Sequence, residues 1–212
     1  MGCEAGSTKD DFDDYFYTSI YTLIRDKQSQ LITDPASNQP APQVSVSPQI
    51  SPNIASYLHW VRVKLSTIDC ASSLYECGEK LIQLKEKKAG ETFFAACIST
   101  IDEAVSENSD PKLYFDTLKY KVQSLYGLAN NDIMSAFEGD CYVKYPNTLK
   151  KLLQSLKKIQ SGMELVINMK DTTEREKYSW LILNGTRHLY ATCDPLMTLG
   201  YSRQVVEFFT WR

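Results

Sequence analysis

In the segment LKKLLQSLKKIQSGMELVI, residues 149–167, apolar residues recur three and four positions apart. Residues at that spacing share one face of an α-helix. The apolar stripe consists of Leu149, Leu152, Leu153, Leu156, Ile159, Met163, Val166 and Ile167. We therefore predict an amphipathic helix whose apolar face packs against other helices.

The same spacing continues on both sides of this stretch, from residue 54 to the C-terminus, without the sustained alternation typical of a strand. Asp110-Pro111 and Thr172-Thr173 mark predicted helix starts. We therefore expect consecutive helices joined by short turns.

The glycines fit this helical prediction, since glycine favours turns and close approaches of the backbone. We place Gly90 in a turn between two helices and expect Gly127, Gly139 and Gly200 at helix ends and turns. Gly185 lies within an apolar helical segment, where it would let another helix approach closely.

The predicted fold class is all-α, with helix pairs stacked as a divergent tetratricopeptide-like solenoid. Residues 84–96 and 196–209 carry the local pattern of such pairs, although the period is not strict. We expect an acidic start and N-terminal helix at residues 1–32, a disordered Pro-rich linker at 33–53, and a helical-repeat domain at 54–212. Five of the eight prolines fall within the linker.

Composition and charge limit the partners and the cellular location that we expect for this protein. The chain has 212 residues, 43% of them hydrophobic, and a net charge of -3, so no excess of cations favours nucleic acid as a partner. The sequence contains no apolar run of about 18 residues, so we predict no transmembrane segment. Its acidic start is unlike a secretory signal. We expect a cytoplasmic protein whose six scattered cysteines are reduced, buried thiols.

No motif predicts catalysis. His59 and His188 stand beside no nucleophile signature, and we interpret both as half-buried structural groups. The cysteines and glycines form neither a metal motif nor a phosphate loop. The predicted protein is therefore not an enzyme and has no cofactor or metal.

Two features suggest protein partners. Lys150, Lys151, Lys157 and Lys158 form two pairs seven residues apart, a basic stripe that suits an acidic partner such as a tubulin surface. A solvated helix face has the same appearance, and that alternative stays open.

The second feature is the apolar C-terminus, with Phe208, Phe209 and Trp211. Because a solenoid normally closes with a polar capping helix, we expect these residues to be uncovered and to bind a neighbouring protein or the rest of a longer chain. We accordingly expect the helical domain to be truncated. Met1-Gly2-Cys3 is similar to the start of acylated proteins, and acylation of Gly2 or Cys3 is left open.

The segment YSWLILNGT at 178–186, followed by LMTLG at 196–200 and VEFFTW at 206–211, resembles the N-terminal region of the cilia- and flagella-associated protein 54 family. The resemblance implies a structural scaffold of helical repeats in the central apparatus of the ciliary or flagellar axoneme. Such a scaffold supports cilium assembly and movement through contacts with other axonemal proteins. The alternative is a general cytosolic helical-repeat adaptor unrelated to cilia.

Overall fold

The computed structural model describes residues 52–107 and 110–210, and within these ranges every regular element is a helix. The all-helical prediction is therefore confirmed for this part of the chain. The chain divides into two compact units, Met1–Leu65 and Ser66–Arg212. The predicted N-terminal helix and almost all of the Pro-rich linker lie outside the described residues.

The described part of the first unit is helix α2, Pro52–Lys64. Its proline lies in the first turn, where the missing amide hydrogen costs no helical hydrogen bond. Tyr57 and Val61, four residues apart, are buried. The helix begins at Pro52, two residues before the predicted start of the helical-repeat domain at residue 54.

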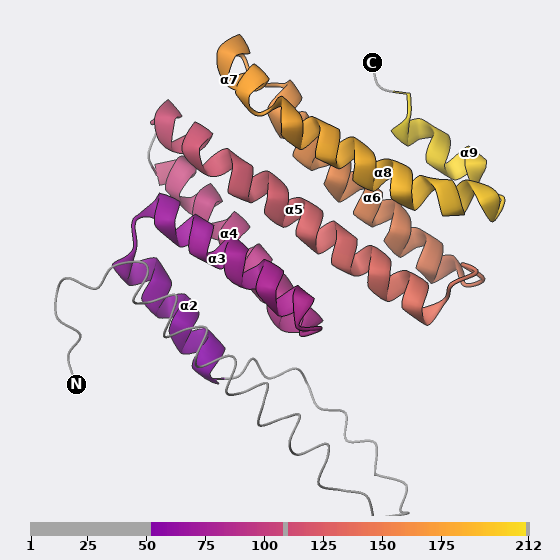
Figure 1. Cartoon of the computed structure of the whole chain (residues 1–212), viewed down its shortest axis with the longest axis horizontal. Helices are drawn as coiled ribbons and strands as arrows, with labels where there is room; N and C mark the ends of the chain where they lie inside the picture. The colour runs from indigo at the N-terminus through magenta and orange to yellow at the C-terminus, as the bar shows by residue number, and fades with distance from the viewer. Residues whose placement is uncertain (1–51, 108–109, 211–212) are drawn as a thin grey trace, which may run out of the picture. The chain divides into compact units, whose positions relative to one another are not determined.

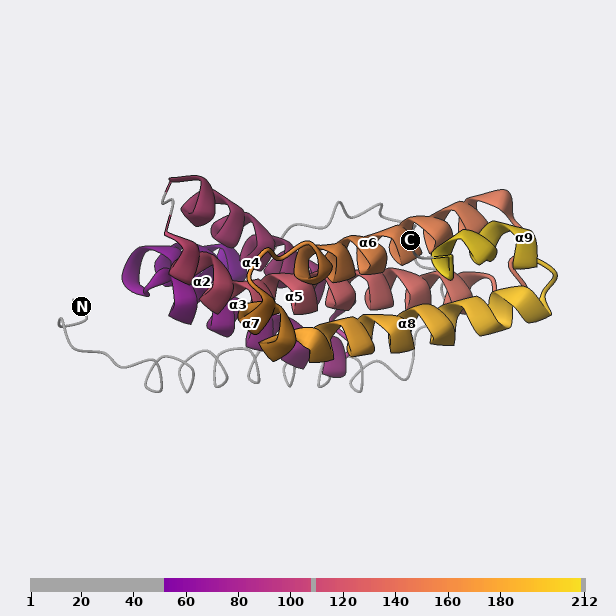
Figure 2. The same ribbon diagram turned by 90° about the horizontal axis from the view of Figure 1, so that it is seen from above.

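The second unit is a series of helices in which neighbours along the chain also pack side by side (Figures 1 and 2). Helix α5 contacts α3, α4, α6 and α8. The long helices are α3 (Thr67–Gln83), α4 (Lys87–Glu107), α5 (Pro111–Gly139), α6 (Pro146–Ile167) and α8 (Ser179–Thr198); the short ones are α7 (Thr172–Lys177), α9 (Ser202–Val205) and the 3-10 helix η1 (Val206–Phe208). A tetratricopeptide-like arrangement of these helices stays a prediction.

Helix α6 contains the stretch that first indicated the fold, and its apolar stripe is the face that packs. Leu152, Leu156 and Ile159 are fully buried, and Met163 and Val166 continue the buried face. They belong to a core that also includes buried residues of α5, α8, α9 and η1, together with Val143, Met169 and Tyr178 between helices. The predicted amphipathic helix is confirmed.

The turn between α3 and α4 differs from the prediction. It is formed at Lys85, which has a φ of 65°, and the amide of Glu86 donates to the Leu81 carbonyl at 2.9 Å. This pattern, with the Lys85 amide donating to Ile82, is a Schellman motif that satisfies carbonyl groups at the end of α3. Gly90 is not in the turn but is buried within α4, so its predicted place was wrong.

Glycines allow two aromatic side chains to lie between helices. A Cβ added at Gly78 in α3 would stand 2.7 Å from the ring of Phe94, and one at Gly127 in α5 would stand 2.6 Å from it. Gly127 is therefore an interhelical contact and not the helix end that we expected. The predicted end and turn positions of Gly139 and Gly200 are confirmed, because Gly139 ends α5 and Gly200 has a φ of 91° after α8.

The second of these aromatic residues is Tyr126 of α5, which lies between Gly162 of α6 and Gly185 of α8. An added Cβ would stand 2.8 Å from the Tyr126 ring at Gly162 and 2.5 Å from its hydroxyl oxygen at Gly185. The hydroxyl donates to the Leu181 carbonyl at 3.0 Å. The predicted close approach at Gly185 is confirmed.

The C-terminal residues are only partly uncovered. Val205 is fully buried and Phe208 is 3% exposed, whereas Val206 and Phe209 are 52% and 46% exposed. Our expectation of an uncovered Phe208 was therefore wrong, because α9 and η1 fold back onto the core with that side chain inward. Trp211 lies outside the described residues.

Candidate protein-binding surfaces

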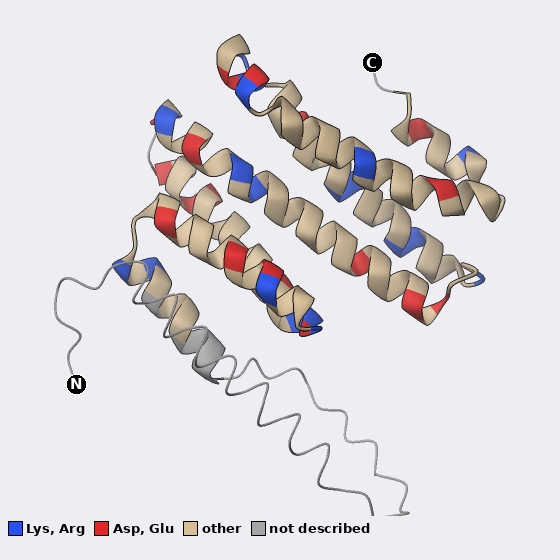
Figure 3. Cartoon of the chain, viewed as in Figure 1, with Lys and Arg blue, Asp and Glu red and all other residues tan. Residues whose placement is uncertain are grey.

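The basic stripe predicted on α6 lies on its outer side. Lys150, Lys151 and Lys157 are exposed and Lys158 is partly exposed, whereas the apolar stripe of the same helix is buried. Figure 3 shows the resulting blue segments along α6. In the described ranges no carboxylate lies within ion-pairing distance of Lys150, Lys151 or Lys157. Most of this surface charge is thus available to an acidic partner.

Lys158 is the exception, because its ammonium group pairs with the carboxylate of Asp132 on α5 at 2.6 Å. This ion pair was not predicted from the sequence, since the two residues are 26 positions apart. Lys151 and Lys158 also line a pocket of about 290 Å³ between α5 and α6. The stripe is therefore divided into an open row, Lys150 and Lys157, and a row that borders a pocket.

Helix α8 carries an exposed apolar face that was not predicted from the sequence. Trp180, Leu183 and Tyr190 are 41%, 63% and 59% exposed, while Leu181 and Leu189 on the opposite side are buried. Spacings of three and seven residues place the exposed three on one side of the helix, with Arg187 between them. Exposed aromatic and apolar residues grouped in this way are typical of surfaces that bind proteins.

The signal for this face was present in the sequence. Trp180 and Leu183, at helical spacing from Tyr190, indicate a second stripe on the other side of the helix. A helix with apolar residues on two sides has more apolar surface than one neighbour can cover.

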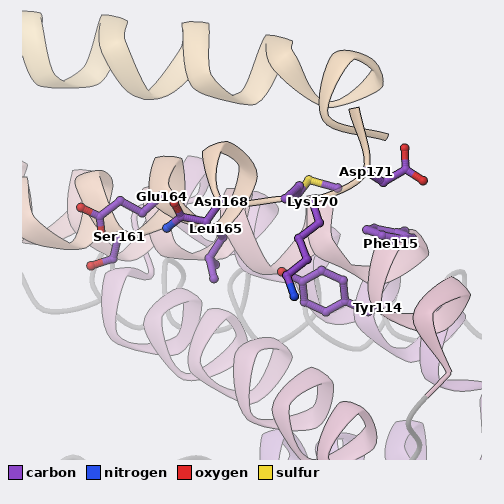
Figure 4. A pocket seen from close by; sticks show the side chains of 9 residues that line it. Tyr114, Phe115, Ser161, Glu164, Leu165, Asn168, Lys170 and Asp171 are labelled. Carbon is purple, nitrogen blue, oxygen red and sulfur yellow. The ribbon is translucent and has the colours of Figure 1, made fainter. Parts of the chain in front are cut away.

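A second pocket, of about 570 Å³, lies where α5 begins and α6 ends (Figure 4). Tyr114 and Phe115 of α5 form one side, with ring centroids 5.6 Å apart, and burial raises the pKa of Tyr114. Ser161, Glu164, Leu165 and Asn168 follow along α6, and the side chain of Lys170 extends toward Tyr114. The pocket combines an aromatic wall with a charged rim, so it suits an apolar side chain.

The two histidines differ in their surroundings. His188 is half-buried: its ring lies 5.6 Å from that of Tyr126, and its Nδ1 is 3.2 Å from the side-chain nitrogen of Asn130. Burial, and secondarily the nearby charge of Arg187, lowers the pKa of His188. The predicted structural environment is confirmed for His188, whereas His59 is exposed and that part of the interpretation was wrong.

The five cysteines of the described residues are free thiols, and most of them lie in the core as expected. Cys70, Cys77, Cys97 and Cys193 are buried, whereas Cys141 in the α5–α6 loop is exposed. The thiol of Cys97 donates to the carbonyl of Ala71 at 3.3 Å. Across residues 52–107 and 110–210, no group of three or more His, Cys, Asp or Glu side chains is placed to hold a metal ion. Within the same residues, no helix combines the length and hydropathy needed to cross a membrane.

Packed helices that present charged and aromatic outer faces are typical of proteins that bind other proteins. The family model described as "Cilia- and flagella-associated protein 54" matches residues 111–212, from the start of α5 to the C-terminus. These residues therefore form an N-terminal region like that of cilia- and flagella-associated protein 54, and the resemblance seen in the sequence is confirmed.

Two curated relatives carry the same name. The chain is 30% identical to cilia- and flagella-associated protein 54 of Chlamydomonas reinhardtii over 89 residues, which cover 42% of this chain and 3% of the relative. It is 23% identical to the Mus musculus protein of that name over 150 residues, 65% of this chain and 5% of the relative. The chain thus spans a small part of these relatives' length. No solved structure matches it.

Proposed function

We propose that this chain is a non-catalytic structural scaffold of the ciliary or flagellar axoneme, within the central apparatus, where it supports cilium assembly and movement. The observation that carries the proposal is the match of residues 111–212 to a family named for association with cilia and flagella. A scaffold works by holding other proteins in place, so the proposal also requires surfaces that bind proteins.

Exposed groups on the helices of the second unit support this requirement. The exposed lysines Lys150, Lys151 and Lys157, the apolar face of α8 and the exposed ring of Phe209 are available for contacts. The partners would be other axonemal proteins, tubulin among them, or further parts of a longer chain. An acidic surface such as that of tubulin would meet the lysines of α6.

Expression of the tagged chain in ciliated cells tests the proposal. We expect it to remain with the axoneme after detergent extraction, and a uniform cytosolic distribution in ciliated cells would contradict the axonemal function. That second result would favour the cytosolic adaptor instead.

A surface variant tests whether α8 contributes to retention. Replacing Trp180, Leu183 and Tyr190 together by Gln should reduce retention without unfolding the chain, because the three side chains are 41%, 63% and 59% exposed. The control replaces Leu84, just after α3, and Met134 of α5, which are 40% and 51% exposed, by Gln. Equal retention of both variants would exclude the α8 face from the axonemal contact.

A further inference from the structure

The pocket between α5 and α6 is rich in hydrogen-bond donors. Helix α6 contributes Lys151, Gln154 and Lys158 to it, and α5 contributes Asp132, Ser135 and the small side chain of Ala136. The lining therefore offers two ammonium groups, one amide and one hydroxyl, against a single carboxylate. Its volume of about 290 Å³ accommodates one polar side chain of a partner.

The carboxylate within the lining leaves the positive charge incompletely balanced. Asp132 pairs with Lys158 at 2.6 Å, and both side chains remain solvent-accessible, at 39% and 43%. Lys151, about two turns before Lys158 on the same side of α6, is exposed and has no carboxylate partner in the described part of the chain. One positive charge of the pocket is thus free, while the ion pair limits the positions available to Lys158.

We propose that this pocket binds the carboxylate of an acidic side chain from an extended segment of a partner protein. The carboxylate would accept hydrogen bonds from Lys151, and the Lys158 ammonium, which keeps donors free beside Asp132, would bind the next acid of the segment. The pocket would thus define the chemistry of one partner of the proposed scaffold. Binding itself does not depend on the proposed function, and only its role in the cell rests on that function.

The spacing of the lysines predicts the pattern of acids in such a segment. Lys151 and Lys158 are seven residues apart on a helix, as are Lys150 and Lys157, which corresponds to a rise of about 10 Å. In a polyproline II segment three residues make one turn and advance about 9 Å, so acids three residues apart lie on the same side of the segment at nearly the same distance. A segment with an acid at every third position would meet successive lysines.

Binding of a fluorescein-labelled peptide with glutamate at every third position among Ser and Gly tests the proposal, by fluorescence anisotropy at low ionic strength. We expect saturable binding, and Lys151→Gln with Lys158→Gln should weaken it by about tenfold, the loss of charge-assisted hydrogen bonds. The matched control, Lys88→Gln with Lys112→Gln, removes the same charge from exposed sites that line neither pocket and should bind nearly as the parent chain does.

A gain of binding provides a test that misfolding cannot imitate. Asp132→Asn removes the only carboxylate of the pocket and should strengthen peptide binding several-fold, whereas Lys151→Gln alone should weaken it with the Lys158 pair intact.

Three results would overturn the proposal: equal weakening by both double variants, no gain with Asp132→Asn, or equal affinity for a single-stranded oligonucleotide of the same charge. If the peptide fails to bind while the tagged chain still stays on the axoneme, the scaffold function stands and only this partner chemistry is lost.

Discussion

The aromatic side chains of Phe94 and Tyr126 each pack against glycines of two neighbouring helices. Gly78 and Gly127 face the Phe94 ring, and Gly162 and Gly185 face Tyr126. Each aromatic side chain therefore occupies space that the methyl group of an alanine would need at these glycine positions.

Adding that methyl group should destabilise the fold. We expect Gly127→Ala and Gly185→Ala to lower the free energy of unfolding by about 1–3 kcal/mol, since overpacking outweighs the higher helix propensity of alanine. At Gly139, where an added Cβ meets nothing within 4 Å, the same substitution should be neutral or mildly stabilising. Denaturant unfolding measures all three, and equal stability of Gly127→Ala and Gly139→Ala would contradict the packing described.

The thiols provide a second test at the scale of single residues. Burial raises the pKa of Cys97 to about 12 and that of Cys193 to about 11. Since the thiolate is the reactive form, both should resist iodoacetamide at pH 8 in the native protein, while exposed Cys141 is alkylated. Peptide mass spectrometry after a short pulse measures this. Comparable labelling of all three in denaturant is the control, and native labelling of Cys97 as fast as Cys141 would contradict its burial.

Two helices end in the same way with different residues. After α3 the left-handed residue is Lys85, with φ 65°, and after α8 it is Gly200, with φ 91°. In both turns the amide of the following residue donates at 2.9 Å to a carbonyl of the preceding helix. Glycine adopts this conformation without a steric penalty, whereas lysine does not.

Substitutions at these two positions should change the free energy of unfolding in opposite directions. We expect Lys85→Gly to raise the free energy of unfolding by up to about 1 kcal/mol, because relief of strain exceeds the added freedom of the unfolded chain. Gly200→Ala should lower it by about 1 kcal/mol. Thermal unfolding of each variant tests this, and a stabilising Gly200→Ala would be inconsistent with the φ value there.

The helices themselves were predictable because apolar spacing reports burial directly. The buried Leu152, Leu156 and Ile159 of α6 follow the stripe read from the sequence. The turn after α3 was not predictable, since Lys85 is an uncommon choice for a left-handed conformation and Gly90 is a common one. Gly90 instead provides space inside α4, where an added Cβ would stand 2.6 Å from Ile82.

The candidate surfaces were only partly predictable for a related reason. Exposure of the α6 lysines follows from their position opposite the apolar stripe. Pairing of Lys158 with Asp132, and the pocket beside it, depend on how α5 lies against α6, which no local pattern encodes. The partner-binding roles of the lysines and of Phe209 stay predictions.

Helix α5 is the most enclosed element of the second unit. It contacts α3, α4, α6 and α8, and Leu118, Val122 and Ala129 are fully buried along it. Helix α7, in contrast, has no buried residue. Local opening should therefore be far more frequent in α7 than in α5.

Hydrogen exchange followed by mass spectrometry tests this expectation in the whole chain. We expect amides in the middle of α5 to exchange slowest and those of α7 to exchange within the shortest labelling times. A denatured sample gives the intrinsic rates for comparison. Equal protection of α5 and α7 would contradict the arrangement of the helices.

The family resemblance could be seen in the sequence because three short segments, residues 178–186, 196–200 and 206–211, are similar to that family. How the helices of a repeat array stack depends on small rotations between neighbours, which apolar spacing does not specify. The predicted domain boundaries depend in part on residues 1–51, outside the described ranges. They stay predictions.

The hydroxyl of Tyr201, just after α8, donates to the carbonyl of Val143 in the α5–α6 loop at 2.7 Å. Val143 is itself buried and has a φ of 50°. The bond connects two segments that are 58 residues apart. An insertion or deletion in either segment would move its end of this bond, so sequences of this type should tolerate changes of length there only when both segments change together.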